Sequence, residues 1–375
     1  MEQHGKQLKV QDKLKMKEKE ITNELPKISI IILNYNGKKW LKDCFESLDN
    51  LDYPKDKYEV IMGDNASSDD SVEYVMKSFP WIRVLKFDKN YGFCKGNNLC
   101  AKEAKGDYLV FLNNDTFVEK DWLKELVKGV LSEKDIISAG CKMLKPYKSD
   151  NNKLVLDYAG GKLTFELNFY EGIYEEDNEK FSVQKYTGFG CGAGVIVKKD
   201  FFLYVGGFDE YYFAGGEELE LGLRAWQYGY KVLYIPSSVM VHKRYGTFKN
   251  MNVNMSSTKL WAKIELYLIL KNYELKNIIL FLPQLFFLVY LPKIIFFIIN
   301  RQPKGSIAVI EGIFEFLKDI KERKILKKIF EYRKRINRNK KRSDKDLYKM
   351  GLMATFKERL KYTIKNAKMY NQLKK

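Results

Sequence analysis

The sequence contains little cysteine, histidine or proline. Its five cysteines include no C-x-x-C pair, which argues against a disulfide framework or a structural zinc site and suits a reducing compartment. The two histidines are His4 and His242, so any metal site must depend mainly on carboxylates. Eight prolines and 25 glycines among 375 residues exclude a fibrous or low-complexity chain. Residues 1–27 lack the apolar core of a signal peptide, and we interpret them as a charged leader.

Positive charge is concentrated at one end of the chain. The sequence has 66 Lys+Arg and 48 Asp+Glu, for a formal net charge of +18. Residues 28–299 contain 35 of each and are neutral, whereas residues 300–375 carry a net charge of +16. A basic tail of this kind favours a polyanionic partner, either nucleic acid or anionic lipid.

Apolar runs alternate with helical patterns through the first half of the chain. The pattern predicts strands at 28–33, 58–62, 82–87, 108–112, 231–236 and 239–242, and helices at 69–78, 96–104, 122–131 and 216–228, the last ended by Gly229. Between 140 and 190, short segments predict hairpins and a variable loop. This alternation predicts an α/β fold with a mostly parallel sheet, which binds ligands beyond the carboxyl ends of its strands.

Two polar clusters follow the first two predicted strands. Asn34, Tyr35 and Asn36 come directly after the first strand, and Asp64 and Asn65 end the second. A carboxylate such as Asp64 can accept a hydrogen bond from the imide N–H of uracil or thymine. Alternatively, these residues only form the turn and cap the next helix.

A third cluster, Asn113-Asn114-Asp115, follows the strand at 108–112. A carboxylate at a strand end can bind Mg²⁺ or Mn²⁺, which in turn bridges the phosphates of a nucleotide. Capping of the following turn is the alternative role for Asp115. His242 is the only histidine outside the leader, and it can complement Asp115 on a metal or be purely structural.

A fourth cluster opens the predicted helix at 216–228. Glu217, Glu218 and Glu220 occupy its first turn, where the helix dipole favours acidic residues, and Glu220 and Arg224 form an i,i+4 pair. A carboxylate next to the hinge formed by Gly215 and Gly216 is also well placed as a general base.

In this order, the clusters resemble the motifs of an inverting family 2 glycosyltransferase, of the rhamnosyltransferase-like branch. The resemblance extends over roughly residues 28–250, about 60% of the chain. The segments that carry it are SIIILNYNG (29–37), VIMGDNASSDDS (60–71), NYGFCKGNN (90–98), YLVFLNNDT (108–116), GFGCGAGVIVKKDFFLYVGGFDE (188–210), FAGGEELELGLRAWQYGY (213–230) and VHKRYG (241–246). It implies a nucleotide-diphospho-sugar transferase fold of the GT-A type with a mostly parallel central sheet.

The resemblance also implies roles for single residues. The residues that would bind the nucleotide and the donor sugar are Asn34, Tyr35, Asn36, Asp64, Asn65, Asn90, Phe93, Lys95, Asn97 and Asn114. Asp115 stands at the final position of the D-x-D metal motif, and His242 falls where related enzymes place another metal ligand. Glu218 falls where the general base is expected, with Glu217 as the second choice.

Two residues depart from the family pattern. Asn113 replaces the first acid of the D-x-D motif, which removes a negative charge but keeps an oxygen ligand. Glu218 replaces an Asp and is one methylene longer.

The reaction implied is the transfer of a sugar, with inversion, from a UDP or dTDP donor to a hydroxyl of a glycan or polyprenyl-linked acceptor. A divalent ion (Mg²⁺ or Mn²⁺) would assist. Guanine is not excluded as the base, and rhamnose is suggested by the branch alone.

The C-terminal third differs in character from the rest. We divide the chain into a leader (1–27), a catalytic domain (28–255), a hydrophobic helical membrane-associating segment (256–305) and a basic amphipathic helical tail (306–375). Residues 277–300 are apolar but contain Pro283 and Pro292, so an interfacial or re-entrant helical pair is expected first. A single membrane span comes second, and a buried core helix third.

The charge next to this apolar stretch favours an anionic membrane surface over nucleic acid. The expected location is the cytoplasmic face of the cell membrane. The alternative is a non-catalytic protein that binds nucleic acid or lipid through its basic tail.

Overall fold

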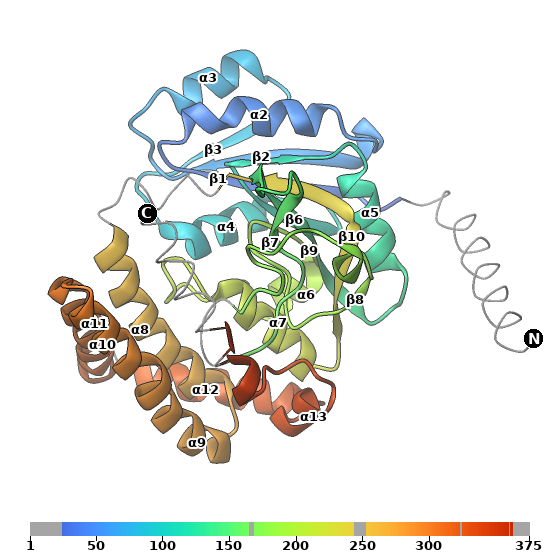
Figure 1. Ribbon diagram of the computed structural model, residues 1–375. Coiled ribbons are helices and arrows are strands. Elements are labelled where there is room, and N and C mark those ends of the chain that lie inside the picture. Colours follow the sequence, from blue (N-terminus) through green and yellow to red (C-terminus); the bar gives the residue numbers. More distant parts are fainter. Residues whose placement is uncertain (1–24, 165–168, 244–252, 323–324, 360, 363–375) are drawn as a thin grey trace, which may run out of the picture.

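A ten-stranded sheet forms the centre of the molecule, and helices cover both of its faces. The computed structural model describes residues 25–164, 169–243, 253–322, 325–359 and 361–362. The helices that precede residue 253 are α2 (Lys38–Asp49), α3 (Ser71–Ser78), α4 (Gly92–Glu103), α5 (Trp122–Leu131), α6 (Lys199–Tyr204) and α7 (Glu217–Gln227). Figure 1 shows α2 and α3 on one side of the sheet and α4, α6 and α7 on the other. This arrangement confirms the predicted α/β fold.

The sheet has a parallel half and a mixed half. Its strands are β1 (Ile28–Asn34), β2 (Tyr58–Asp64), β3 (Arg83–Lys86), β4 (Tyr108–Asn113), β5 (Thr116–Val118), β6 (Ile136–Lys148), β7 (Leu154–Tyr158), β8 (Lys185–Tyr186), β9 (Gly194–Lys198) and β10 (Lys231–His242). They run in the order β3-β2-β1-β4-β9-β6-β10-β5, with β7 paired to β6 and β8 to β10. Strands β3, β2, β1 and β4 are parallel to one another. Strand β9 is antiparallel to both β4 and β6.

The burial of β1 explains why its sequence is almost entirely apolar. Ile30, Ile31 and Ile32 are each fully buried because helices cover both faces of the strand. The strand ends at Asn34, which is in register with Asp64 at the end of β2. Polar residues therefore gather at the carboxyl edge of the parallel half, as predicted.

Several elements differ from the predicted ones. Helix α2 was not predicted, although its buried residues Leu41, Cys44, Phe45 and Leu48 recur at helical spacing. Helix α4 begins at Gly92 rather than at residue 96. The two strands predicted at 231–236 and 239–242 are the single strand β10, whose register to β6 shifts between Ile235 and Val239.

Helix α7 has the bounds that the sequence indicated. It ends at Gln227, and Gly229 follows with a φ of +92°, a left-handed conformation that favours glycine at a helix end. The hairpin predicted after residue 140 is formed by β6 and β7.

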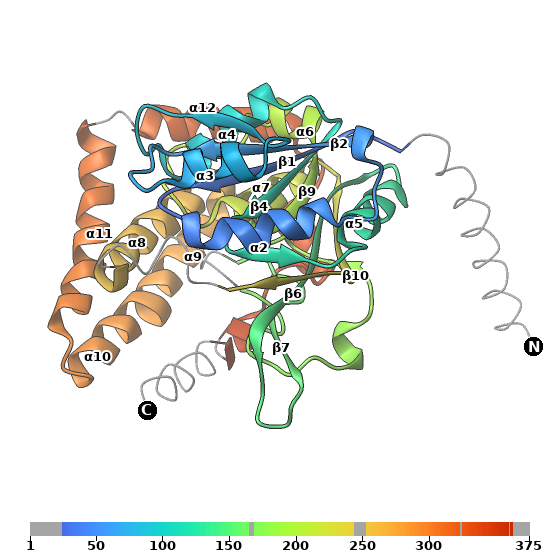
Figure 2. The ribbon, with the colours of Figure 1, turned by 90° about the horizontal axis from the view of Figure 1, so that it is seen from above.

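The helices that follow residue 253 gather in one group beside the sheet (Figure 2). They are α8 (Val253–Asn272), α9 (Leu275–Leu285), the π-helical turn η3 (Phe286–Tyr290), α10 (Leu291–Ile299), α11 (Pro303–Glu322), α12 (Ile325–Asn339) and α13 (Asp344–Lys349). Because α9, η3 and α10 follow one another without a break, residues 275–299 form one helix. This corrects the helical pair expected within 277–300. The π-helical turn lies between Pro283 and Pro292, where a proline removes a backbone donor.

Helix α8 belongs to the same hydrophobic core as the sheet. Its residues Ile264, Tyr267 and Leu268 are fully buried within that core. At its end, the side-chain amide of Gln227 in α7 donates a 2.9 Å hydrogen bond to the carbonyl of Asn272. Packing is therefore continuous across residue 255, where the sequence suggested a boundary.

Candidate active site

The first group of predicted site residues lies where β1 and β2 end. Asn34 donates from Nδ2 to Oδ1 of Asp64 at 3.2 Å. The carboxylate of Asp64 also accepts bonds from the backbone N–H (3.0 Å) and the hydroxyl (2.6 Å) of Ser67. Asp64 is only 3% exposed. Bonds to Asp64 from Ser67, three residues later, are the arrangement expected of a residue that closes a turn.

A network of amide side chains joins this turn to two neighbouring loops. The Nδ2 atom of Asn114, which follows β4, donates to Oδ1 of Asn34 at 2.8 Å. Asn36 has a φ of +51°, and its Oδ1 accepts from the backbone N–H of Ser68 at 2.7 Å. Tyr35 is 37% exposed at the surface between these contacts. The loops after β1, β2 and β4 therefore form one rigid edge with an exposed aromatic ring.

Gly37 allows this edge to close. A Cβ atom at position 37 would lie only 2.3 Å from Nδ2 of Asn114 and 2.4 Å from Oδ1 of Asn34. A side chain there would separate the two amides.

The segment 90–97 folds against the same edge. Asn65 donates from Nδ2 to the carbonyl of Gly92 at 3.3 Å and accepts from the backbone N–H of Tyr91 at 3.3 Å. Asn90 accepts from the N–H of Gly92 at 2.9 Å. These bonds satisfy backbone groups at the start of α4, which explains why the helix begins earlier than predicted.

Three further predicted residues lie on α4. Phe93 donates its backbone N–H to the carbonyl of Phe213 at 2.7 Å, just before the glutamate helix. Asn97 is buried and donates to the carbonyl of Phe93 at 2.9 Å. The ammonium of Lys95 lies 4.3 Å from the centre of the Tyr91 ring. The first turns of α4 thus connect the edge of the parallel half to the loop that precedes α7.

Asp115 and His242 are neighbours, as the sequence suggested. Residue 242 ends β10, in register with Thr116 of β5. Its Nε2 atom lies 3.4 Å from Oδ1 of Asp115 and 3.4 Å from the amide nitrogen of Asn113. Asp115 is also buried. The two side chains that were predicted as metal ligands therefore face each other.

The other ring nitrogen of His242 is held by a residue that sequence reasoning missed. Nδ1 lies 2.9 Å from Oδ2 of Asp157, which is fully buried on β7. The ammonium of Lys145 on β6 lies 2.8 Å from the other oxygen of Asp157. Burial by itself lowers the pKa of His242, but its hydrogen bonds to Asp115 and Asp157 outweigh this and raise it above its ordinary value.

These residues fit a divalent cation that is also held by its substrate. No group of three His, Cys, Asp or Glu side chains suited to a metal ion occurs among the residues that the structure describes. Mg²⁺ and Mn²⁺ are commonly bound by one or two protein ligands together with phosphate oxygens. Asp115 and Nε2 of His242 supply two such ligands. The contact of Asp157 with Nδ1 is the kind of hydrogen bond that usually orients a metal-binding histidine.

The glutamates of α7 are separated from the loop that contains Asp115 by the backbone that precedes β9. The backbone N–H of Asn113 donates to the carbonyl of Ala193 at 3.1 Å. A Cβ atom at the preceding residue, Gly192, would lie 3.6 Å from Oε1 of Glu217 and 3.7 Å from Cβ of Glu218. A short stretch of backbone thus separates the two groups.

Glu217 and Glu218 are both buried, although they carry carboxyl groups. They follow Gly215 and Gly216, whose φ angles are +94° and +86°. Burial, followed by the charge of Glu218, raises the pKa of Glu217 well above its ordinary value. The Sγ atom of Cys94 on α4 lies 3.9 Å from Oε2 of Glu217.

Glu218 has a different environment. Its Oε1 accepts a 2.7 Å hydrogen bond from the hydroxyl of Tyr170. Its Oε2 is buried and accepts no hydrogen bond from an N–H or hydroxyl group among the described residues. The side chain of Glu217 lies within hydrogen-bonding reach of Glu218, and this contact contributes to the raised pKa of Glu217. Glu218 thus has one oxygen fixed by Tyr170 and one oxygen to which no N–H or hydroxyl group of the described chain donates.

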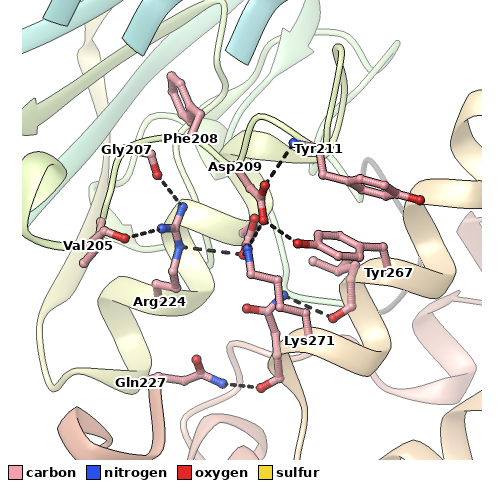
Figure 3. Close-up of polar contacts among 12 residues, drawn as sticks. Val205, Gly207, Phe208, Asp209, Tyr211, Arg224, Gln227, Tyr267 and Lys271 are labelled. Atoms are coloured by element: carbon pink, nitrogen blue, oxygen red, sulfur yellow. Dashed lines mark hydrogen bonds and ion pairs between the residues drawn. The ribbon is translucent and has the colours of Figure 1, made fainter. Parts of the chain in front are cut away.

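The third glutamate of α7 serves the structure rather than the site. Glu220 is fully buried, and its Oε1 lies 2.5 Å from the ammonium of Lys271 on α8, whereas Arg224 is 3.9 Å away. Figure 3 shows that Arg224 instead donates to the carbonyls of Val205 and Gly207, at 3.0 and 2.9 Å. The i,i+4 pair expected from the sequence is thus the weaker contact of Glu220.

Lys271 also binds Asp209, so one ammonium joins two buried carboxylates (Figure 3). Asp209 further accepts a 2.7 Å hydrogen bond from the hydroxyl of Tyr267 and lies 2.9 Å from the ammonium of Lys328 on α12. These contacts fasten α8 and α12 to the helix that carries Glu217 and Glu218.

Part of the chain matches a known family. Residues 29–203, less than half of the chain, match the model of the family described as glycosyl transferase family 2. This match and the glycosyltransferases that align with the chain support a glycosyltransferase. The matched segment contains the edge at β1, β2 and β4 together with Asp115, whereas Glu218 and His242 follow it in the chain.

Curated relatives match a longer part of the chain. A 238-residue alignment with probable N-acetylgalactosaminyltransferase 9 of Caenorhabditis elegans is 29% identical and covers 58% of this chain and 40% of the relative. Rhamnosyltransferase WbbL of Escherichia coli is 26% identical over 57% of this chain and 83% of its own length. The chain thus spans less than half of the first relative. Because both transferase types match at similar identity, the matches do not single out the rhamnosyltransferase-like branch.

A solved structure confirms the GT-A type of fold. The crystal structure of GalNAc-T7 with UDP, GalNAc and Mn²⁺ superimposes with a TM-score of 0.52 at 20% sequence identity. The match covers 65% of this chain and 48% of that one.

Two residues of the site, Asp157 and Tyr170, were not anticipated. Both lie in the 140–190 region, which the sequence indicated only as hairpins and a loop. Asp157 lies within the buried strand β7. A carboxylate in a buried strand requires a charged partner, and this is the one signal that could have pointed to Asp157.

Proposed function

We propose that the protein transfers a sugar, with inversion, from a nucleotide-diphospho-sugar to a hydroxyl group, with Glu218 as the general base. The observation that carries this proposal is the difference between its two carboxylate oxygens. One is held by the hydroxyl of Tyr170, and the other is buried and accepts no hydrogen bond from an N–H or hydroxyl group of the described chain. The family 2 match of residues 29–203 and the glycosyltransferase relatives support the reaction class.

In this reaction Glu218 accepts the proton of the acceptor hydroxyl while the hydroxyl oxygen attacks the anomeric carbon. The bond from that carbon to the diphosphate oxygen breaks on the opposite side, which inverts the configuration. One base is sufficient because the nucleotide diphosphate is a good leaving group when its charge is offset. Tyr170 fixes the direction in which the carboxylate points.

The donor would lie along the edge formed by the loops after β1, β2 and β4. Tyr35 offers an exposed ring beside the base position, and Lys95 offers a positive charge on α4. We propose that Asp64 shapes the base-binding turn through Ser67 and Asn34, and that a uracil or thymine base binds at this turn. The GalNAc-T7 crystal structure contains UDP and GalNAc, which favours a UDP donor.

Asp115 and Nε2 of His242 would hold a divalent ion, Mg²⁺ or Mn²⁺. When bound, the ion would offset the charge that develops on the leaving diphosphate. Asp157 holds the imidazole so that Nε2 points toward Asp115, and Asn113 lies beside it.

The acceptor would approach from the side of α7 and α8. The indole nitrogen of Trp261 on α8 would lie 3.2 Å from a Cβ atom at Gly215, next to the glutamates. We propose a glycan or lipid-linked hydroxyl as the acceptor and rhamnose as one donor sugar to test.

The first test is the release of nucleotide diphosphate from a panel of UDP-, dTDP- and GDP-sugars with Mg²⁺ or Mn²⁺. We expect release with at least one donor, and loss of about 10²–10⁴-fold in Glu218→Gln, the range that a general base contributes. Glu210→Gln, an exposed glutamate just before α7, is the matched control. Release by Glu218→Gln at the rate of the unaltered protein would exclude Glu218 as the base.

The second test separates metal binding from the base. Calorimetric titration of the donor with and without Mn²⁺ should show a metal-dependent affinity that Asp115→Ala removes and Glu218→Gln preserves. Equal donor affinity of the unaltered protein with and without Mn²⁺ would contradict the proposed metal site.

A further inference from the structure

The helix formed by residues 275–299 presents apolar side chains along its exposed side. Its mean hydropathy reaches 2.1, and only 28% of the most apolar stretch is buried. The buried residues Ile278, Phe281, Leu285 and Val289 recur every three or four residues, so they lie on one face and the exposed apolar residues lie on the rest of the helix surface. The most exposed of these apolar residues are Leu275, Ile279, Leu280, Phe286, Phe287, Leu291, Ile295, Ile298 and Ile299.

The opposite face of the same helix packs against α8 and its end between residues 278 and 290. The ring of Phe281 packs edge-on against Tyr273 at 5.2 Å between centres. Further along, the hydroxyl of Tyr290 donates a 2.7 Å hydrogen bond to the carbonyl of Ala262. The exposed apolar residues therefore lie on the outer surface of a packed element and not on a helix detached from the protein.

Helix α11 lies next to α10 and continues this surface. The turn between them is tight, because a Cβ atom at Gly305 would lie 2.5 Å from the ring of Phe297. Four apolar side chains of α11 are exposed at helical spacing, namely Ile307, Ile310, Phe314 and Leu317. We call the exposed apolar residues of the helix 275–299 and of α11 the apolar helical face.

Cationic side chains border this face. Arg301 lies in the turn between α10 and α11 and Lys304 in the first turn of α11. Both are exposed, and neither forms an ion pair within the described part of the chain. Lys318 and Lys321 are exposed near the end of α11. Residues 300–322 contain four basic and four acidic side chains, so the whole net charge of +16 of residues 300–375 lies after α11, in residues 323–375. An apolar surface on a protein with so basic a C-terminal segment matches the chemistry of an anionic lipid bilayer.

The same charge argues against a second copy of the chain as the occupant. Each copy carries a formal net charge of +18, and like charges oppose the association of two copies.

From this surface we infer that the apolar helical face docks the protein onto an anionic membrane, with the helix 275–299 lying along the membrane surface instead of crossing it. The length and composition of that helix would permit a single span. Its packing opposes one, because α8 and α11 are joined by ion pairs that would have to enter the hydrocarbon with it. These are Lys259–Glu315 at 2.7 Å and Lys263–Asp319 at 2.8 Å. Charged groups in that environment are costly.

This docking goes beyond sugar transfer and is measured without a donor. The test is flotation of the full-length protein with vesicles of phosphatidylcholine alone or of phosphatidylcholine with phosphatidylglycerol, at low and high salt. We expect flotation with the anionic vesicles, and at least about tenfold weaker association with phosphatidylcholine alone, because each basic residue near an anionic surface contributes about 1 kcal/mol. Equal binding to both vesicle types would overturn the charge argument.

The variant that tests the surface is the triple change Ile279→Glu, Phe287→Glu and Ile298→Glu. All three side chains are at least 59% exposed, so the changes leave the packed face intact. The matched control introduces three glutamates at exposed apolar positions of the catalytic part, with Met76→Glu, Val183→Glu and Leu203→Glu. The two triple variants have the same net charge, so charge alone affects them equally.

We expect the control to float and the first variant to lose association by at least about tenfold, since burying an exposed Ile or Phe side chain contributes about 1.5–3 kcal/mol. Both should retain the thermal unfolding midpoint of the unaltered protein. Flotation of the first variant equal to that of the control would overturn the proposal.

Alkaline carbonate separates a surface helix from a spanning one. We expect carbonate to release the vesicle-bound protein, because a helix lying in the interface is not anchored through the bilayer. Retention in the membrane after carbonate would overturn the surface orientation. Light scattering gives the final check, since dimers that the first triple variant abolishes would identify a second copy as the occupant instead.

Discussion

The hydroxyl of Tyr170 donates a 2.7 Å hydrogen bond to Oε1 of Glu218. Tyr170 reaches this carboxylate from the segment after β7, where its ring packs against Tyr158 and Phe189. A residue far from α7 in sequence thus sets the orientation of the proposed base.

Removal of that hydroxyl should slow the reaction without unfolding the protein. A hydrogen bond to a charged group contributes about 1.5–3 kcal/mol, so Tyr170→Phe should lower kcat about 10- to 100-fold. The KM for the donor should change little, because Tyr170 does not contact the nucleotide edge. Steady-state kinetics of diphosphate release measures both parameters. The control is Tyr186→Phe, which removes a 2.7 Å bond to Glu133 on the surface and should leave kcat unchanged.

Glu217 should tolerate loss of its charge better than Glu218. Burial and the neighbouring charge of Glu218 raise the pKa of Glu217 well above its ordinary value, which favours its protonated form. Glu217→Gln replaces the carboxyl group by an amide that resembles this protonated form in size and charge. We expect it to keep at least about a tenth of the wild-type kcat, against a loss of about 10²–10⁴-fold in Glu218→Gln. The reverse order of activities would assign the base to Glu217.

Asp157 should control metal affinity through His242. Asp157→Asn weakens the acceptor for Nδ1 and leaves Lys145 without its partner. Loss of a hydrogen bond that orients a metal ligand typically costs about 10- to 100-fold in metal affinity. Titration of Mn²⁺ in the presence of nucleotide diphosphate measures this. Asp177→Asn, which also removes the partner of a buried β6 lysine (Lys142), is the matched control and should leave the affinity unchanged.

The buried contacts of Lys271 should appear as stability that depends on pH. Burial alone would raise the pKa of Asp209, but Lys271 and Lys328 outweigh it and hold that pKa below its ordinary value. A carboxyl group with a lowered folded-state pKa contributes stability above its unfolded pKa of about 3.9, and this contribution is lost as the pH falls below that value.

Lys271→Met tests this contribution. Removing one partner of a buried pair costs about 3–5 kcal/mol at neutral pH. Denaturant unfolding at a series of pH values should show this difference at pH 7 and a smaller one below about pH 4, where protonation of the carboxyl begins to compete. Lys124→Met, which breaks the exposed pair with Asp52, should leave the midpoint unchanged at both pH values. A deficit of Lys271→Met that stays constant with pH would contradict the role given to Asp209.

The sequence predicted most of the parallel half of the sheet because its central strands β1 and β4 are almost entirely apolar. It also brought Asp115 and His242 together correctly, since both end strands at one edge. The features that the sequence did not predict depend on contacts between segments that are far apart in the chain. Asp157 is an acid within a strand, and only the fold shows that it lies beside His242.

The same limit explains the treatment of the C-terminal helices. Lys271 lies in the segment 256–305 and Lys328 in the segment 306–375, which the sequence indicated as separate from the catalytic domain. Their partners, however, are Asp209 and Glu220, which precede residue 255. Pairing between charges so far apart in the chain leaves no local signal. The helix 275–299 likewise continues through two prolines because neighbouring helices support it, which helix propensity alone does not predict.

The ammonium of Lys271 has a consequence for how this protein can be divided. A fragment ending at residue 255 would keep Asp209 and Glu220 but lose both lysines that neutralise them. The glutamate helix would then carry buried negative charge with no cation from α8 or α12, and we expect such a fragment to aggregate. The segment that matches the family model, residues 29–203, is therefore shorter than the part of the chain that we expect to fold on its own. Shortened versions of the protein should extend at least through α12.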